Sequence, residues 1–389
     1  MGNRALAHIE KVKNIVPVYY EGNPAEKVEM VQVLDFLVMA QRGEFKIGDL
    51  AVFIEVDSIL PEKPVFEFLR PKKFIIKAMK MGSKFADTNG NRIISQGILF
   101  KPSEVLENIE IVEGLDVTTQ LGILKVIEDT EEDASLKDPR TLTFKTKLHR
   151  SLMKHSWYRY LNKLYINVVG SPIKGVWADW MPVKSDETNI QNIFTRLKTK
   201  FGDSKGWIVT EKMEGQNMSV YRYTDTKLFG LIKNRTNGVC THSRNLITDD
   251  GSQFWKTAKK LELIKKLNSL NHDYFIRGEH CGPGIQKNIY DFKDYKFFVF
   301  EIYDIENSRL LTYDETIEIC NKIGLDFVPV LDLDYQLPNS AAELLEYSTA
   351  ASKHNPKRLR EGVVLRRRDN PLISVKARSP RYLAGDKTP

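Results

Sequence analysis

Short apolar runs separated by turn residues fill residues 1–126, and they restrict the fold of this part of the chain more than any other feature. Four runs have the length and composition of β-strands: Met30 to Val38, Leu50 to Val56, Ile93 to Leu99 and Asp116 to Leu121. Glycine, proline and an Asn-Gly pair lie between them. The pattern predicts a small closed or partly closed β-barrel.

The rest of the chain changes character twice. Residues 127–139 are acidic and polar, which is typical of a linker, and a basic helix is expected from Lys147 to Tyr165. From about Val176 onward, strand-like runs alternate with helical stretches such as Trp255 to Leu270 and Tyr313 to Ile323. We therefore expect an α+β protein in three parts: a nucleic-acid-binding barrel over 1–126, a linker and basic helix over 127–172, and a larger domain over 173–389.

Basic residues gather in two zones of a chain whose formal net charge is +7. Residues 355–389 hold ten Lys and Arg against three acids, and residues 141–174 hold seven without an acid. Aromatic side chains lie among the second zone, including Trp157, Tyr158 and Tyr160. Cations that neutralise phosphates, together with rings that stack on bases, favour nucleic-acid binding, although either zone could also be a solvated face.

Several classes of protein do not fit the sequence. No run approaches the length of a membrane span, and the N-terminus lacks the apolar block of a signal peptide. We expect an intracellular protein, in cytoplasm or nucleus, that is not secreted and has no membrane partner. Cys240, Cys281 and Cys320 have no zinc-type spacing, so neither a disulfide framework nor a structural zinc site is expected.

The segment Thr210 to Asn217 carries the candidate chemistry. Lys212 ends an apolar run, with an acid two places later and a glycine three places later. A glycine lets the backbone turn tightly against a ligand. A lysine attacks only as the neutral amine, so burial or neighbouring cations must lower its pKa. This short pattern is common by chance, so its meaning depends on the segments that follow.

Five further segments follow in a fixed order. They are Arg235 with Arg244-Asn245, Arg277-Gly278-Glu279, Phe297 to Asp304, Glu361 to Arg366, and Ser374-Val375-Lys376. In this order they resemble the collinear motifs of the covalent nucleotidyltransferase superfamily, which comprises DNA ligases, RNA ligases and mRNA capping enzymes. The resemblance implies a nucleotidyltransferase (ligase adenylation) domain.

Within that superfamily, the chain is most similar to ATP-dependent RNA ligases that carry an OB-fold at the N-terminus. Gly238 to Asn245 and the run Ser185 to Asn192 are similar to that group. In the first 126 residues, Arg42 to Asp49, Ile59-Leu60-Pro61 and Ile94 to Ile98 resemble its OB domain. The resemblance covers most of the chain and implies that the barrel is an OB-fold β-barrel that tracks a nucleic-acid backbone.

The resemblance implies catalysis through a lysine-linked AMP. Lys212 would attack the α-phosphate of ATP, and the AMP would pass to a 5′-phosphate before a 3′-OH displaces it. Glu214, Glu361 and Lys376 are the other expected catalytic residues. Glu279 and Glu361 would hold Mg²⁺ or Mn²⁺ through oxygen donors and retained waters. A bound metal and Lys376 would supply the positive field that Lys212 needs.

The nucleotide would contact a larger set of residues. Glu279 would bind the ribose, Phe300 would stack on the adenine, and Glu211 would lie near the adenine edge. Asn217 would reach the phosphate of the nick. Five cations would neutralise phosphate oxygens, namely Lys233, Arg235, Arg244, Arg366 and Lys376.

Two positions depart from the superfamily pattern. Glu214 stands where many relatives have Asp, and Ser374-Val375-Lys376 stands where many have Lys-x-Lys. Domain order selects among the members, because capping enzymes and DNA ligases place an OB domain after the nucleotidyltransferase domain, and Lys376 lies 13 residues from the last residue.

We therefore expect a monomeric RNA ligase that joins 5′-phosphate and 3′-OH ends of RNA, at nicks in a duplex with an RNA 3′-OH strand. Two alternatives stay open. One is a nucleic-acid-binding protein with an inactive ligase domain, and the other is a DNA ligase of unusual domain order.

Overall fold

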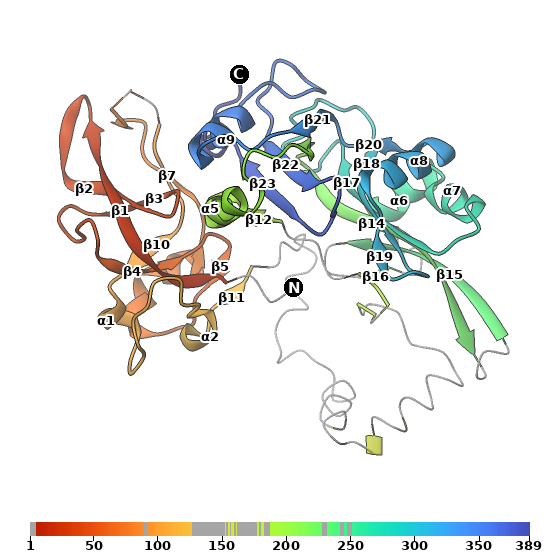
Figure 1. The fold of residues 1–389 in the computed structure, drawn as a ribbon, viewed down its shortest axis with the longest axis horizontal. Helices are drawn as coiled ribbons and strands as arrows, with labels where there is room; N and C mark the ends of the chain where they lie inside the picture. Colours follow the sequence, from red (N-terminus) through yellow and green to blue (C-terminus); the bar gives the residue numbers. More distant parts are fainter. Residues whose placement is uncertain are drawn as a thin grey trace.

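The computed structural model describes the two ends of the chain at length and parts of its middle (Figure 1). The described residues are 5–88, 90, 92–126, 152, 155, 157, 158, 161, 177, 178, 180–182, 187–227, 232–241, 245, 246 and 251–389. The linker and basic helix expected over 127–172 lie outside these residues, apart from five single positions.

The N-terminal part is built from short strands. Its elements are β1 (Ala7–Tyr20), β2 (Asn23–Val33), β3 (Phe36–Gln41), β4 (Leu50–Ile54), β5 (Ser58–Ile59), the 3₁₀ helix η1 (Pro64–Lys72), β6 (Ile75–Ile76), β7 (Met79–Lys80), β8 (Phe85–Ala86), β9 (Ile94–Ser95), β10 (Ile98–Phe100), α1 (Pro102–Val105), α2 (Thr118–Leu121) and β11 (Leu124–Lys125). The largest sheet has the order β10-β4-β1-β2-β3, with β8 paired to β1.

Strand β1 is the centre of this part and was not expected from the sequence. Its 14 residues pair with β4 in the first half and with β2 in the second. Charged residues alternate with apolar ones along it, so the run looks polar although Ile9 and Val12 are buried in two separate cores. Strand β1 can therefore pair with both β2 and β4 while its apolar residues pack in the cores.

The expected strands need two corrections. The run Met30 to Val38 is a hairpin, because the chain reverses between Val33 and Phe36 with Leu34 at φ 51°. The run Asp116 to Leu121 is mostly the helix α2 and not a strand. The carboxylate of Asp116 accepts a hydrogen bond from Thr118 N at 2.9 Å, which is a local contact that favours a turn over an extended strand.

The C-terminal part begins at residue 187 and combines longer strands with helices. Its elements are β12 (Thr188–Asn189), α5 (Ile190–Phe201), β13 (Trp207–Lys212), β14 (Gln216–Lys227), β15 (Ile232–Thr241), β16 (Asn245–Leu246), α6 (Gln253–Lys260), α7 (Leu263–Ser269), β17 (Tyr274–Cys281), β18 (Lys296–Asp304), β19 (Arg309–Leu310), α8 (Tyr313–Ile323), β20 (Asp326–Phe327), β21 (Val330–Tyr335), α9 (Ala341–Ser348), β22 (Gly362–Arg367), β23 (Ser374–Arg378) and α10 (Pro380–Ala384).

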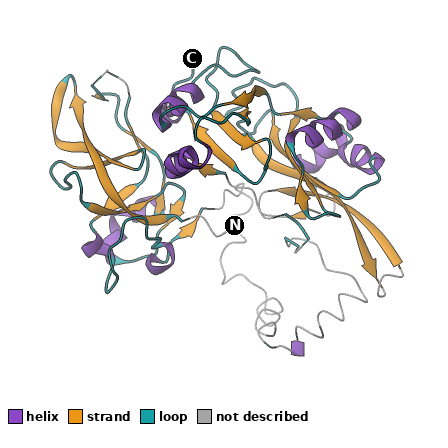
Figure 2. Ribbon diagram, in the orientation of Figure 1, coloured by secondary structure: helices purple, strands orange, loops and turns teal. Residues whose placement is uncertain are grey.

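Two sheets, each covered by helices on one face, form this part (Figure 2). The sheet β12-β23-β22-β13-β21 packs its buried face on α5 and α9, where Trp207, Val363 and Leu344 meet. The sheet β16-β15-β14-β17-β18-β19 packs on α6, α7 and α8. Helix α8 coincides with the expected Tyr313 to Ile323, whereas the expected helix from Trp255 to Leu270 is interrupted at Glu262, whose φ is 52°.

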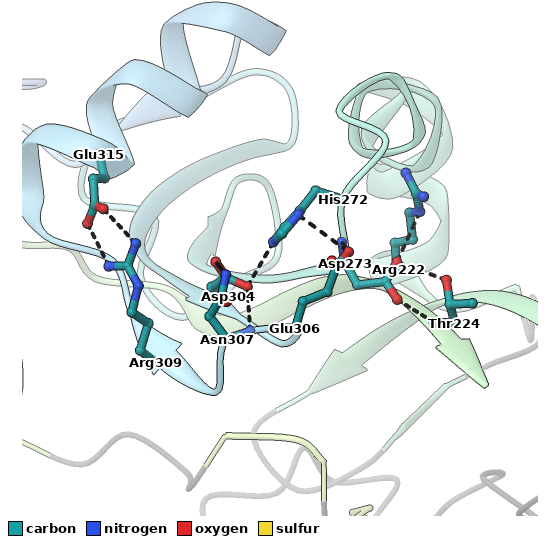
Figure 3. A network of polar contacts seen from close by, with 9 residues as sticks. All are labelled: Arg222, Thr224, His272, Asp273, Asp304, Glu306, Asn307, Arg309 and Glu315. Atoms are coloured by element: carbon teal, nitrogen blue, oxygen red, sulfur yellow. Dashed lines mark hydrogen bonds and ion pairs between the residues drawn. The ribbon is translucent and has the colours of Figure 1, made fainter. Parts of the chain in front are cut away.

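A polar network joins the ends of β14, β17 and β18 (Figure 3). Asp273, one residue before β17, accepts hydrogen bonds from Thr224 N at 2.5 Å and from Thr224 Oγ1 at 3.1 Å. Asp304, the last residue of β18, is bonded to His272 and Asn307. These contacts fix the relative positions of the three strands that carry much of the site described next. None of the described helices is long and apolar enough to cross a membrane.

Candidate active site

A cavity lies between the two sheets of the C-terminal part. Its empty space is about 900 Å³, which includes space open to solvent. Residues of both sheets and of α8 line it: Glu187, Ile208, Thr210, Glu211, Lys212, Met213, Asn217, Glu279, Phe300, Leu311, Tyr313, Thr316, Phe327, Val328, Val364, Arg366 and Arg367.

Strand alternation explains why polar side chains face this cavity. In β13 the odd positions Trp207 and Val209 are buried against helices, so Ile208, Thr210 and Lys212 face the other way. The same holds in β22, where Val363 and Leu365 are core residues.

The register of the sheet arranges the cavity-side residues in rows. Lys212 lies opposite Gly362, which lies opposite Arg378. The next row is Thr210, Val364 and Lys376, and the third is Ile208, Arg366 and Ser374. Residues directly opposite each other lie on the same face of the sheet. The face that lines the cavity is therefore polar at the Lys212 end. In its middle row, Thr210 and Val364 lie beside Lys376.

Lys212 is held by carboxylates. Its Nζ lies 2.8 Å from Glu361 Oε1, and its side chain is 26% exposed. Burial opposes the ammonium form, but the charges of Glu361 and Glu279 outweigh it and raise the pKa of Lys212, while Arg378 acts in the opposite direction. Burial and a nearby cation, the two effects expected to lower this pKa, both act here, but the two carboxylates outweigh them. Arg378 is the cation that acts on Lys212 here.

The donor set around Lys212 suits a hydrated cation. Glu361 and Glu279 are the two carboxylates that act on Lys212, and the described residues contain no group of three His, Cys, Asp or Glu that could hold a metal. Mg²⁺ and similar ions are commonly held by one or two carboxylates together with waters and substrate phosphates. The residues fit that mode and do not form an all-protein cage.

The two other acids of the lysine segment differ in position. Glu211 lines the cavity but is 1% exposed, with Oε2 bonded to Lys353 N at 2.8 Å and Oε1 buried without a hydrogen-bond partner. Burial raises the pKa of Glu211. Glu214 is not among the lining residues, and Tyr382 and the backbone of Ile289 bind its carboxylate.

Arg366 faces the cavity with its guanidinium already engaged. It lies 3.1 Å from Glu301 and 3.4 Å from Glu187, and it donates to the carbonyl of Phe300 at 3.1 Å. Glu301 in turn pairs with Arg277 at 2.6 Å. Arg366 therefore joins the strand that carries Phe300 to β22, instead of standing free to neutralise a phosphate.

Two segments of the chain match models of known domain families. Residues 205–379 match the family model described as RNA ligase, and residues 6–102 match an OB-fold domain model. The chain carries an RNA ligase domain preceded by an OB-fold domain. No curated protein matches the chain.

Solved structures of Naegleria gruberi RNA ligase resemble nearly the whole chain. A mutant form with ATP and Mn has 26% identity and a TM-score of 0.71, over 99% of this chain and 98% of that chain. A mutant form with AMP and Mn has 26% identity and a TM-score of 0.71, over 98% and 99%. The form with PPi has 26% identity and a TM-score of 0.69, over 98% of each chain. The predicted family and the α+β fold with an N-terminal OB-fold are confirmed.

The ligase domain brings together about half of the residues predicted for the site. Six of them line the cavity: Glu211, Lys212, Asn217, Glu279, Phe300 and Arg366. Glu361 touches Lys212, and Lys376 lies on the cavity face of β23 by its register.

Two predicted phosphate-binding cations of the ligase domain are not among the residues that line the cavity, and a third lies outside the described residues. Lys233 and Arg235 lie exposed on β15, opposite Thr226 and Thr224 of β14, and neither lines it. Strands β14 and β15 form a long hairpin (Figure 1), and both residues lie on β15. Arg244 lies outside the described residues.

Several lining residues of the ligase cavity escaped the sequence analysis. Glu187 directly precedes β12, and Tyr313 and Thr316 lie on α8. The sequence of α8 predicts only an amphipathic helix. Arg378 had a signal, since it stands two places after Lys376 and therefore on the same face of β23. The chain thus has Lys-x-Arg at 376–378, close to the Lys-x-Lys of many relatives.

Much of the C-terminal basic zone is paired within the ligase domain. Arg367 binds Asp369, Arg368 binds Asp314, and Arg381 binds Asp386. Each of these three arginines is therefore already paired with an acid of the same domain. The three cysteines are buried and free, as expected.

Proposed function

We propose that this chain is an ATP-dependent RNA ligase that joins a 5′-phosphate to a 3′-OH, at nicks in duplexes with an RNA 3′-OH strand, through a lysyl-AMP on Lys212. The observation that carries the proposal is the position of Lys212, at the polar end of the cavity between the two sheets and 2.8 Å from Glu361. The similar Naegleria gruberi RNA ligase structure that contains ATP and Mn supports the choice of ATP and of Mg²⁺ or Mn²⁺.

Three transfers balance the reaction. The neutral Nζ of Lys212 attacks the α-phosphorus of ATP, a P–N bond forms, and the P–O bond to pyrophosphate breaks. A 5′-phosphate oxygen of the RNA then attacks the AMP phosphorus and releases Lys212, which takes up a proton. Finally the 3′-OH attacks the 5′-phosphorus, loses its proton, and AMP leaves.

The chain's own residues would hold the nucleotide in place. Phe300 on one wall and Val364 with Ile208 on the other offer apolar surfaces for a purine ring. The buried Oε1 of Glu211, which lacks a hydrogen-bond partner, offers an acceptor to an amino group at the ring edge. A divalent cation bound through Glu279 and Glu361 supplies positive charge where negative charge develops on the phosphates.

Incubation with α-labelled ATP and Mg²⁺ or Mn²⁺, followed by denaturing electrophoresis, tests the covalent step. The wild type should retain label, and Lys212→Ala should retain none. Lys205→Ala removes an exposed lysine of the same domain and should label like the wild type. Absence of label from folded wild type that carries no AMP beforehand would favour the nucleic-acid-binding alternative.

Nicked duplexes test the substrate. Replacing the ribonucleotides at the 3′-OH end by deoxyribonucleotides should slow sealing greatly, whereas a DNA ligase would seal both. An RNA with unpaired ends serves as the control for the nick itself.

A further inference from the structure

The turn after Lys212 is held at four points on a single residue. Glu214 N donates to the hydroxyl of Tyr290 at 2.5 Å, and Glu214 O accepts from Cys281 Sγ at 3.4 Å. The carboxylate accepts from Tyr382 OH at 2.7 Å and from Ile289 N at 3.2 Å. Glu214 is 6% exposed, so these partners replace water for both carboxylate oxygens.

Tyr382 reaches this turn from the short helix α10. Ser379 caps α10 by accepting from Tyr382 N at 3.1 Å, and Ser379 N donates to the carbonyl of Glu361 at 2.9 Å. Glu361 is the residue whose carboxylate contacts Lys212. The cap and helix of α10 therefore contact two acids near Lys212. Ser379 bonds to the backbone of Glu361, and Tyr382 bonds to the carboxylate of Glu214.

Close packing leaves the turn little freedom to adjust. A Cβ at Gly215 would come within 2.5 Å of the carbonyl of His280 and 2.8 Å of Glu279 Cγ. Tyr382 is itself confined, with Lys287 Nζ 4.7 Å from the centre of its ring. Loss of the phenolic hydroxyl would leave one oxygen of Glu214 without its donor in a place that water cannot readily fill.

We propose that Tyr382 is a positioning residue for the adenylation of Lys212. Its hydroxyl anchors Glu214 away from the cavity, and the anchored turn holds Lys212 Nζ in line with the phosphorus that it attacks. The inference rests on the proposed function, since it assigns a role in the lysyl-AMP step. It also gives Glu214 a structural task in place of the catalytic role expected from the sequence.

A positioning role of Tyr382 predicts loss of one reaction step, whereas a general loss of stability would impair every step. Formation of lysyl-AMP depends on the position of Nζ, whereas sealing of an RNA strand that already carries AMP on its 5′-phosphate makes no new bond to Lys212. A displacement of about 1 Å can cost on the order of a hundredfold in rate. We expect Tyr382→Phe to lower the rate of lysyl-AMP formation about ten- to a hundredfold, with little change in the KM for ATP.

The experiment measures both steps on the same preparation of full-length protein. Single-turnover labelling over a range of ATP concentrations gives the first, and sealing of a nicked duplex with a pre-adenylylated strand gives the second. Tyr347→Phe is the matched control, because Tyr347 is a half-buried tyrosine of the same domain that packs on Tyr335. It should leave both steps unchanged.

Each outcome has a distinct meaning. Selective loss of the first step in Tyr382→Phe supports the positioning role, and the retained second step shows that the variant is folded. Wild-type labelling by Tyr382→Phe, or equal loss of both steps, overturns it. If the wild type itself forms no lysyl-AMP, the proposed function has failed, whatever Tyr382 does.

Discussion

Lys212 is held as an ammonium, whereas attack on a phosphate requires the neutral amine. Glu361 and Glu279 retain the proton, and the same two acids are the ones that the proposal gives to the metal. A bound cation would offset the negative field that raises the pKa of Lys212. In the proposed reaction, Lys212 would therefore attack only once a cation is bound at Glu279 and Glu361.

Arg366 gives the first prediction at this scale. Its planar guanidinium serves Glu301, Glu187 and the carbonyl of Phe300 together, which an ammonium cannot do. Arg366→Lys should raise the KM for ATP in adenylate formation by about tenfold, since it loosens the strand that carries Phe300. Arg368→Lys, at an exposed pair with Asp314, is the control and should change little.

Gly215 gives a second prediction. The carbonyl of His280 would stand 2.5 Å from any Cβ there, and backbone cannot move aside cheaply. Gly215→Ala should displace Glu279 or the turn and reduce lysyl-AMP formation at least tenfold, measured by labelling at saturating ATP. Gly82→Ala, whose Cβ would meet nothing closer than 3.8 Å, should behave as wild type. Equal activity of the two variants would contradict the argument.

At the scale of elements, α5 connects the two domains. Gln191 Nε2 donates to the carbonyl of Asp35 at 2.7 Å, and Asn192 Nδ2 donates to Glu55 Oε1 at 2.6 Å. Phe194 of α5 packs in the core of the sheet that carries Lys212. One helix thus belongs to the ligase core and also bonds the OB-fold domain (Figure 1).

The double variant Gln191→Ala with Asn192→Ala should separate two activities. Labelling by ATP should stay near the wild-type level, because neither Gln191 nor Asn192 lines the cavity. Sealing of a nicked duplex should fall about tenfold, because the OB-fold domain loses its fixed orientation toward the ligase domain. Thr195→Ala, on the exposed side of α5, is the control, and parallel loss of both activities in the double variant would refute this division.

Prediction of elements from the sequence succeeded where one face is buried and one is not. Helix α8 follows from the sequence, because its buried residues Thr316, Cys320 and Ile323 recur at helical spacing. Strand β1 was missed because charged residues on its open face hide its alternation. Helix α2 was missed because a four-residue helix is decided by local side-chain bonds that periodicity does not report.

At the scale of the whole molecule, His8 lies in a buried acidic pocket near the contact between the domains. Burial opposes its charge, but hydrogen bonds to Glu10 at 2.7 Å and Glu55 at 3.3 Å raise the pKa of His8 to about 9. Glu55 is also the acceptor for Asn192 of α5. The charged imidazole therefore stabilises the OB-fold side of this contact.

A pH dependence of stability follows. Because the folded pKa lies above the ordinary 6.5, the stabilisation is fully present below pH 6.5 and is lost as pH rises through about 9. The free energy of unfolding should fall by up to about 3 kcal/mol across that range. His8→Gln should flatten this part of the profile in urea titrations, whereas His155→Gln, at an exposed histidine, should not.

The sequence by itself determined that an OB-fold domain precedes a ligase domain, because the segments typical of each domain stand in linear order along the chain. The tertiary structure decided which charges are free. Arg366 and Glu214 are charged residues, as the sequence shows, but both are already engaged by residues distant in the chain. Arg366 pairs with Glu301, and Glu214 accepts a hydrogen bond from Tyr382. Pairing depends on which side chains packing brings within hydrogen-bond distance, and no local pattern records that.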